Sequence, residues 1–218
     1  MLYIVSTPIG NLEDITLRAI RTLKEVDYIT AEDTRHTQIL LNKYEIKNHV
    51  LSYHSYSSPA KLEKIIDLLK EGKSVALVSD AGTPGISDPA YTLIRRAIEE
   101  DIQISPIPGA SALLAALVMS GQRMNEFVYL GFLPLKKGRQ TLLKSLAEEK
   151  RSIVIYESPH RILRTLSDLQ EYLGDRPIAV CREITKIYEE ALRMPISEAI
   201  EHFKIKAPKG EFVLVIGS

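Results

Sequence analysis

Short apolar runs alternate with amphipathic segments along the first half of this 218-residue chain. Strand-like runs are expected over residues 2–5, 28–31, 49–53, 74–78 and 102–106. Helical patterns fill the intervals, over residues 17–25, 37–44, 89–100 and 110–119 and in a segment that opens at Ser58. Repeated strand–helix units imply a mostly parallel sheet with helices on both faces. The alternation therefore predicts the α/β class.

The second half of the chain has more strand and less helix. Strands are expected over residues 127–132, 153–156, 178–181, 187–192 and 211–216, and helices over 140–149, from Ser158 onward, and in one short stretch before the last strand. Such a pattern predicts a mixed sheet with antiparallel members. A soft boundary near Ser120–Arg123 divides the chain into expected domains 1–118 and 119–218.

The loop Ser79–Pro89 follows the buried strand 74–78 and precedes a helix. It holds two Gly, two Pro, two Asp and three hydroxyl residues in eleven positions, which is richer than a plain connector needs. Ligands of open α/β sheets bind at the carboxyl ends of strands, where this loop lies. Asp88 and Pro89 are expected to cap the next helix, at the N-cap and the first helical position. The other residues are expected to face a ligand.

Composition narrows the kind of protein. The 28 basic and 28 acidic residues cancel, which argues against non-specific nucleic-acid binding by bulk charge. Cys181 is the only cysteine, so an internal disulfide is excluded. Residues 1–6 have no basic segment typical of a signal peptide, and no apolar run reaches the ~18 residues of a membrane span. We expect a cytoplasmic protein without a membrane partner.

Six turns that follow strands are rich in polar residues, Gly or Pro. They are residues 6–12, 31–36, 79–89, 107–112, 157–161 and 182–186. Such turns at the same end of their strands are expected to converge on one site.

Several common site motifs are absent from the sequence. There is no G-x-G-x-x-G after the first strand, no P-loop and no G-x-S-x-G elbow. The five His residues show no H-x-x-x-H pair, so no metal site is expected.

Seven segments occur in an order that resembles a known family. They are Thr7–Leu12, Ala31–Arg35, Ser79–Pro89, Ile107–Ser111, Gly131–Pro134, Glu157–Arg161 and Lys209–Val213. The sequence resembles the ribosomal RNA small subunit methyltransferase I family, within the tetrapyrrole-methylase-like (class III) methyltransferases. The chain departs from the family pattern at Ala90, where Gly is frequent, and it ends at the last expected strand, where many members continue.

The resemblance implies a two-domain tetrapyrrole-methylase-like fold, with a mostly parallel N-terminal sheet, a mixed C-terminal sheet and an active-site cleft between the domains. It implies S-adenosylmethionine as cofactor and 2′-O-methylation of a cytidine in the decoding region of small-subunit (16S) rRNA. The expected partners are this rRNA, within the assembled subunit, and a second copy of the chain in a homodimer.

The resemblance also assigns candidate cofactor-binding residues: Ile9, Asp80, Thr83, Ile86, Ser87, Ser111, Ala112, Tyr156 and Gly210. Their chemistry agrees, because a helix N-terminus suits the methionine carboxylate and glycines allow close backbone approach. Ile86 and Tyr156 suit the adenine ring.

A ribose hydroxyl needs a group that takes its proton, because it is a poor nucleophile at neutral pH. The candidates are Glu32, Asp33, Asp80, Glu157 and His160. Structural roles remain open for three of them. Asp33 could cap the following helix, Glu157 could pair with Arg161, and His160 could lie in the first turn of a helix.

RNA contacts are expected from cations near the motif turns: Arg35, His36, Lys136, Arg139, Arg161 and Arg164. Arg matches phosphate with a fixed fork of donors, whereas Lys144 and Lys150 fit a solvated helix face better. With zero net charge, the shape of the RNA should matter as much as its charge.

Two other functions remain open from the sequence. One is a superfamily methyltransferase that acts on a tetrapyrrole or another small molecule. The other is a non-catalytic module that binds RNA or a metabolite, since no residue is an obvious catalytic base. A sugar-phosphate enzyme is a weaker third possibility because the phosphate-binding motifs are missing.

Overall fold

The computed structural model describes residues 1–54, 57–88 and 90–218, and the chain divides into two compact units. Unit 1 is Met1–Ser111 and unit 2 is Ala112–Ser218. The division lies before the expected boundary at residue 118 because helix α5 (Ala112–Ser120) packs on strands of unit 2. This helix is apolar almost throughout, and Ala116 and Leu117 are buried.

Unit 1 contains a parallel sheet of five strands in the order β3-β2-β4-β1-β5. The strands are β1 (Leu2–Val5), β2 (Tyr28–Ala31), β3 (His49–Ser52), β4 (Val75–Val78) and β5 (Ile104–Ile107). Every residue of β4 is buried, as a continuous apolar run in a doubly covered sheet requires. The predicted parallel sheet is confirmed.

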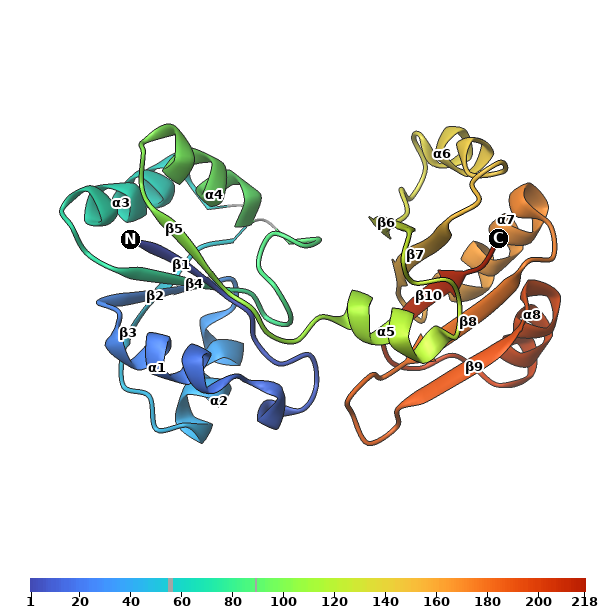
Figure 1. Ribbon diagram of the computed structural model, residues 1–218, viewed down its shortest axis with the longest axis horizontal. Helices are drawn as coiled ribbons and strands as arrows, with labels where there is room; N and C mark the ends of the chain where they lie inside the picture. Colours follow the sequence, from blue (N-terminus) through green and yellow to red (C-terminus); the bar gives the residue numbers. More distant parts are fainter. Residues whose placement is uncertain (55–56, 89) are drawn as a thin grey trace. The chain divides into compact units, whose positions relative to one another are not determined.

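Helices cover both faces of this sheet (Figure 1). They are α1 (Leu17–Glu25), α2 (Thr34–Lys43), α3 (Pro59–Lys70) and α4 (Ala90–Glu99), with a 3₁₀ turn η1 (Leu12–Asp14) before α1. The helices α1 and α2 share one core cluster with the sheet, and α3 and α4 share another. Helix α2 begins three residues earlier than expected because Asp33 caps it. Pro89, expected at the first position of α4, lies outside the described residues.

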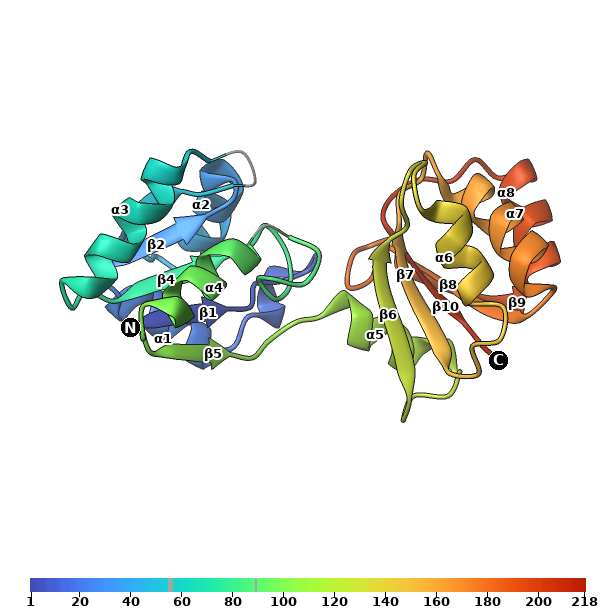
Figure 2. The same ribbon diagram turned by 90° about the horizontal axis from the view of Figure 1, so that it is seen from above.

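Unit 2 contains a mixed sheet of five strands in the order β6-β7-β10-β8-β9. The strands are β6 (Phe127–Phe132), β7 (Ser152–Glu157), β8 (Pro177–Arg182), β9 (Glu190–Pro195) and β10 (Phe212–Ile216). Only the β6–β7 pair is parallel, so the expectation of antiparallel members is confirmed. The helices α6 (Arg139–Ser145), α7 (Ile162–Leu173) and α8 (Ile196–Ile205) cover one face, and α5 packs on the other (Figure 2).

The strand expected over residues 187–192 was placed wrongly. The segment before β9 is a turn in which Glu183 and Thr185 have φ angles of 49° and 66°. Ile187 and Tyr188 are 94% and 69% exposed, so these apolar side chains do not mark a buried strand. The bounds of β9 follow instead from its pairing with β8, with Glu190 opposite Arg182.

Two helices of unit 2 are shorter than expected. Helix α6 ends at Ser145 because the guanidinium of Arg176 takes up the following carbonyl groups of Ala147 and Glu149, at 2.6 and 2.8 Å. Helix α7 begins at Ile162 rather than at Ser158, since a turn closed by the Arg161 N–H and the Ser158 carbonyl (3.1 Å) precedes it.

The single thiol of the chain lies inside unit 2. Cys181 on β8 is fully buried, and its Sγ is 3.8 Å from the Ala116 carbonyl oxygen of α5. Among the described residues, no helix combines the length and the apolar character that crossing a bilayer requires.

Candidate active site

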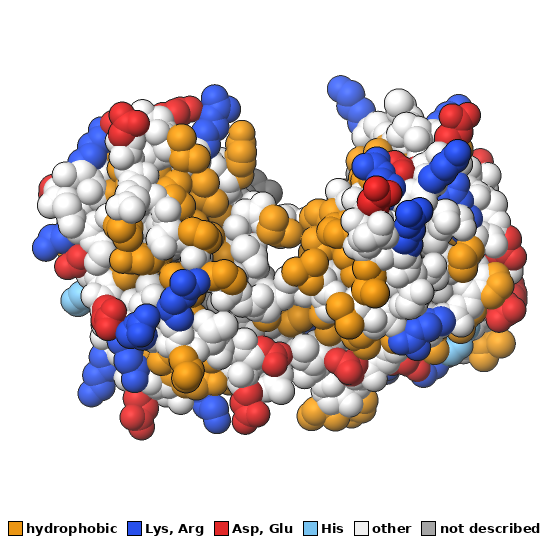
Figure 3. Space-filling model, in the orientation of Figure 1, with side chains coloured by type: hydrophobic (Ala, Val, Ile, Leu, Met, Phe, Trp, Pro, Cys, Tyr) orange, Lys and Arg blue, Asp and Glu red, His pale blue; other side chains and the backbone are white. Residues whose placement is uncertain are grey.

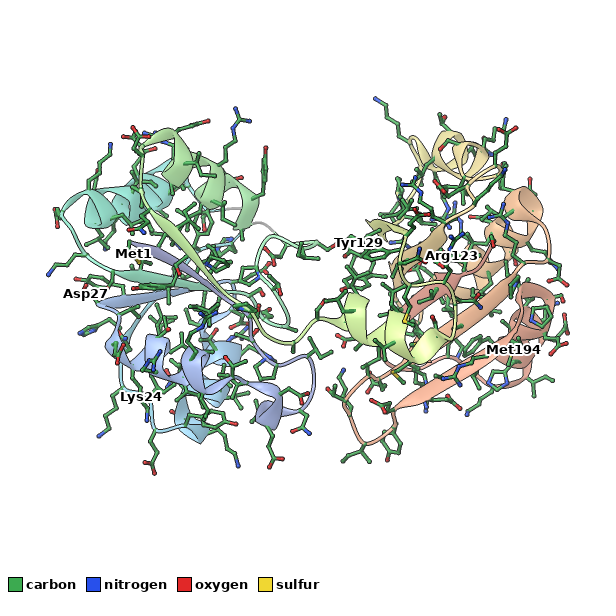
Figure 4. All side chains as sticks on the ribbon, in the orientation of Figure 1. Met1, Lys24, Asp27, Arg123, Tyr129 and Met194 are labelled. Carbon is green, nitrogen blue, oxygen red and sulfur yellow. The ribbon has the colours of Figure 1, made fainter. Side chains whose placement is uncertain are left out.

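The polar turns of unit 1 gather at the carboxyl end of its sheet, opposite the end marked by Met1 and Asp27 (Figure 4). The turn after β1 is joined to the loop after β4 by two backbone hydrogen bonds between Thr7 and Gly82, at 2.9 and 3.0 Å. The Thr7 hydroxyl donates to the Ser79 carbonyl (3.1 Å), and the hydroxyls of Ser6 and Thr83 are 2.8 Å apart. These bonds fix the loop that the sequence singled out.

Glycines allow these turns to approach closely. Gly82 has a φ of 77°, in the left-handed region that side chains disfavour. At Gly109, in the turn after β5, a Cβ atom would lie 2.9 Å from the Cβ of Ser6. A larger residue at 109 would therefore push the β5 turn away from the β1 turn. Ile9, a predicted cofactor contact, packs beside Gly82.

The turn after β2 joins the same group through the carboxylate of Asp80. The Asp33 N–H donates to Oδ1 of Asp80 at 3.1 Å. Asp33 itself caps α2 through the Arg35 N–H (2.8 Å) and forms an ion pair with the Arg35 guanidinium (2.7 Å). Hydrogen bonds from the Arg35 side chain and backbone hold the pKa of Asp33 far below its usual range. Asp33 is thus a weak proton acceptor.

Glu32 lies at the same end of the sheet, and its pKa is shifted in the opposite direction to that of Asp33. Its pKa is raised above the ordinary 4.5, first by burial and then by the negative charges of Asp80 and Asp88, while His54 opposes the shift. A carboxylate with a raised pKa holds a proton more strongly, which is what a general base needs.

Glu32 also lines a cavity of about 640 Å³ in unit 1. The wall is formed by the segment after β3, the end of the β4 loop and the first turns of α3 and α4. It contains Glu32, Tyr53, His54, Ser57, Ser58, Pro59, Leu62, Ser87, Asp88, Tyr91 and Thr92. This volume is within the range of small-molecule sites.

In unit 2, three strand ends carry the predicted residues. Glu157 at the end of β7 and Arg182 at the end of β8 both pair with Phe212, the first residue of β10. Gly210, which comes just before β10, therefore lies at the same end of the sheet. Gly210 has a φ of 88°, and a Cβ there would lie 2.6 Å from the Glu183 side chain. The Glu183 Oε1 accepts from the Glu211 N–H and from Lys186 Nζ, both at 3.0 Å.

Glu157 belongs to a buried polar network. Its side chain is completely buried and accepts from the Thr165 hydroxyl (2.6 Å) and the Ser158 N–H (2.8 Å), with Arg161 at 3.4 Å. These bonds satisfy the carboxylate within the unit, which suits a structural role better than proton transfer.

Arg139 is part of the same network. It is 3% exposed and donates to Asp168 (2.6 Å), Thr165 (2.9 Å) and the Pro134 carbonyl (3.1 Å). Because its guanidinium is engaged inside the unit, Arg139 does not present it to a phosphate, contrary to the expectation from the sequence.

Tyr156, another predicted cofactor contact, lies in an aromatic cluster on β6 and β7. Its ring makes edge contacts with Tyr129 (5.2 Å) and Phe132 (5.8 Å), and Tyr129 is labelled in Figure 4. The Tyr156 hydroxyl accepts from the Leu113 N–H at 3.1 Å, next to Ala112. Burial raises the pKa of Tyr156, so it stays neutral at physiological pH.

The remaining predicted residues lie at the surface of their units. Arg35, His36, Lys136, His160 and Arg164 are exposed, as are Ile86 and Ser87, whereas Ser111 and Arg161 are half-buried. His160 lies in the turn before α7 and not in the helix. Basic and acidic side chains are interspersed on the visible face of each unit (Figure 3).

Sequence reasoning missed most of the cavity wall. Tyr53, His54 and Tyr91 were not expected at a site, and Asp88 was expected only as a helix cap. The available signal was position, since Tyr53 directly follows the end of a strand in the parallel sheet. Among the described residues, no group of three or more His, Cys, Asp or Glu side chains could hold a metal ion.

Comparisons with known proteins agree over nearly the whole chain. The family profile of the Tetrapyrrole (Corrin/Porphyrin) Methylases matches residues 1–200. A ribosomal RNA small subunit methyltransferase I from Thermotoga maritima is 53% identical over 215 residues, which covers 99% of this chain and 97% of that protein. The protein of the same name from a Synechocystis species is 50% identical, with 99% and 78% covered.

Solved structures with a similar fold are more distant in sequence. A cobalt precorrin-4 methyltransferase matches with a TM-score of 0.74 at 19% identity, covering 99% of this chain and 94% of that one. Uroporphyrin-III C-methyl transferase from Thermus thermophilus, complexed with S-adenyl homocysteine, matches with a TM-score of 0.69 at 17% identity, covering 100% and 97%. At such identities the likeness shows the fold alone, and it confirms the expected tetrapyrrole-methylase-like architecture.

Proposed function

We propose that this chain, which belongs to the ribosomal RNA small subunit methyltransferase I family of the tetrapyrrole methylases, methylates a ribose in small-subunit rRNA. The proposed target is the 2′-hydroxyl of a cytidine. The chain is an S-adenosylmethionine-dependent methyltransferase, and small-subunit rRNA is its substrate. The proposal specifies the decoding region as the target and the assembled subunit as the preferred form. It also includes a cytoplasmic location and a homodimer, and sedimentation of the purified protein would test the dimer.

The residues at the ends of the two sheets suit this cofactor. In unit 1, the loop after β4 offers the Thr83 hydroxyl and the 44% exposed side chain of Ile86. In unit 2, the half-buried Tyr156 offers an aromatic ring, and the absence of a Cβ at Gly210 lets the Glu183 side chain pack against the backbone there. Polar groups combined with apolar surface are what a ligand with a charged amino acid and an adenine requires.

In the proposed reaction, the chain orients the cofactor and the ribose and removes the proton of the ribose hydroxyl. When bound, S-adenosylmethionine supplies a methyl group on a sulfonium that leaves readily. The bonds between Thr7 and Gly82, and between Ser6 and Thr83, hold the cofactor loop rigid before binding. Such preorganisation lowers the entropy cost of aligning the reactants.

Glu32 is the residue we propose as proton acceptor for the ribose hydroxyl. Asp33 is neutralised as a base by Arg35, and Glu157 is buried with its oxygens engaged. Asp80 accepts the Asp33 N–H and raises the proton affinity of Glu32 by its charge. Glu32 combines a raised pKa with a place in a cavity wall.

RNA binding is proposed to use exposed cations of both units: Arg35, His36, Lys136, Arg161 and Arg164. Arg35 is accessible to RNA, since its side chain is 90% exposed although it pairs with Asp33. An exposed ion pair contributes little to stability, so the guanidinium can exchange its partner for a phosphate at small cost.

The observation that carries the proposal is the 53% identity to a named small-subunit rRNA methyltransferase over 99% of this chain. The test uses small ribosomal subunits from a strain that lacks the 2′-O-methyl cytidine. After incubation with the protein and labelled S-adenosylmethionine, mass mapping should find one new ribose methyl group on a cytidine. Naked rRNA should accept less label than assembled subunits. Label on a base, or only on an added tetrapyrrole, would refute the proposal.

A further inference from the structure

The cavity of unit 1 is larger than the transfer of one proton to Glu32 requires. Its volume is about 640 Å³, and it reaches from Glu32 at the end of β2 to Tyr91 on α4. Tyr53 is 7% exposed and forms part of its inner wall, while Tyr91 is 63% exposed at the surface. A space bounded by two aromatic residues suggests a planar ligand.

The charge of the wall limits which ligand can enter. Two lining residues are acidic, Glu32 and Asp88, and among the lining residues that the structure describes none is Lys or Arg. A phosphate group would be disfavoured, because the two carboxylates repel it and, among the described lining residues, only His54 can carry a positive charge. A neutral ligand that donates hydrogen bonds fits better, because carboxylates only accept them.

Asp88 is held in a fixed orientation. Its Oδ1 accepts the N–H groups of Gly85 (2.8 Å) and Ala90 (2.9 Å), and both bonds use this one oxygen. The carboxylate is thereby anchored at the start of α4 and cannot rotate freely. A side chain fixed in this way can distinguish a hydrogen-bond donor from an acceptor on a ligand.

We propose that this cavity binds the unstacked cytosine ring of the target nucleotide, with Asp88 accepting a hydrogen bond from the exocyclic amino group and Tyr91 stacking on the ring. The inference rests on the proposed function and adds the determinant of base choice. Cytosine presents an amino donor where uracil presents a carbonyl acceptor, and acidic side chains read that donor. Single-stranded RNA bases are commonly bound on aromatic side chains in this way.

The test is Asp88→Asn, which keeps Oδ1 as an acceptor for Gly85 and Ala90 but replaces the second oxygen by an amide donor. Subunits are prepared with cytidine or uridine at the mapped target position. The wild type should prefer cytidine by about tenfold or more in kcat/KM. D88N should lose this preference and gain activity on uridine. Asp67→Asn on the exposed side of α3 is the control with the same charge change, and it should keep the wild-type ratio.

Stacking is tested by Tyr91→Ala and Tyr91→Phe. Loss of the ring should lower kcat/KM by about 5- to 150-fold, the equivalent of ~1–3 kcal/mol, whereas Phe should retain most of the activity. Cofactor affinity, measured by calorimetry, should be the same in both variants. Equal losses in the Ala and Phe variants would contradict stacking.

A second measurement separates this inference from the proposed function. Saturation-transfer NMR with free cytidine and free uridine reports binding without methyl transfer. The wild type should saturate cytidine more than uridine, and D88N should reverse or remove the difference. Selective cytidine binding without rRNA methylation would leave the cavity assignment standing and overturn the proposed function. Methylation with an unchanged cytidine-to-uridine ratio in D88N would overturn the cavity assignment alone.

Discussion

Replacing Gly210 by Ala should weaken unit 2 locally and disturb the turn before β10. Two costs add at this position. The backbone has a φ of 88°, which a residue with a Cβ adopts only at a cost of roughly 1–2 kcal/mol. The new methyl group would also lie 2.6 Å from the Cγ, Cδ and Oε1 atoms of Glu183, so the Glu183 side chain must move.

The movement of Glu183 sets the second cost. Its Oε1 accepts from Lys186 Nζ and from the Glu211 N–H, each at 3.0 Å, and both bonds would be lost. At about 1 kcal/mol for each hydrogen bond, the loss is ~2 kcal/mol. The matched control is Gly121→Ala, where φ is 70° and a Cβ would meet nothing within 4 Å. G210A should therefore lower the local stability by ~2 kcal/mol more than G121A.

The assay is hydrogen exchange in increasing urea, followed by mass spectrometry of peptides from β8 and β10. It reports the opening free energy of unit 2 without assuming that both units unfold together. Equal values for G210A and G121A, within about 0.5 kcal/mol, would refute the argument that the Glu183 contact controls this turn.

Three further variants test the site. Glu32→Gln should lower kcat by about 10²–10⁴-fold with unchanged cofactor affinity. Since burial raises the pKa of Glu32, wild-type activity should fall on acidification at a pH above the ordinary 4.5. A fall centred at 4.5 would contradict a buried Glu32 as the proton acceptor. Thr83→Ala removes the 2.8 Å contact with Ser6 and should raise the cofactor Kd about fivefold in calorimetry, a cost of ~1 kcal/mol; an unchanged Kd would argue against Thr83 as a cofactor contact. Arg139→Met should cost unit 2 about 3 kcal/mol in urea because it removes the buried bonds to Asp168, Thr165 and the Pro134 carbonyl. It should leave the salt dependence of RNA binding unchanged, and a shallower salt slope would restore its RNA role.

Much of the fold follows from local sequence. The strands 2–5, 28–31 and 127–132 have the bounds that their apolar runs predict, because each run ends in turn residues. The strand β9 does not, since its bounds depend on pairing with β8, and pairing between distant segments cannot be read from one apolar run. Ile187 and Tyr188 gave the apolar signal there, although both are exposed.

The candidate site was predictable in part for the same reason. The turns after β1 and β4 carry Gly, Pro and hydroxyl residues, and the structure brings them into contact through Thr7 and Gly82. The cavity wall required the order β3-β2-β4, which places the segments after β3 and β4, with Tyr53 and Asp88, on either side of Glu32 after β2. Asp88 does cap α4, and that local role concealed its place in the wall.

The position of Cys181 has a practical consequence for labelling. Burial raises the pKa of this thiol to about 11, so almost no reactive thiolate forms at neutral pH. Maleimide dyes attack thiolates, and the native chain should therefore stay unmodified. A cysteine introduced at an exposed position would then carry the only fluorophore, with no need to remove the natural one.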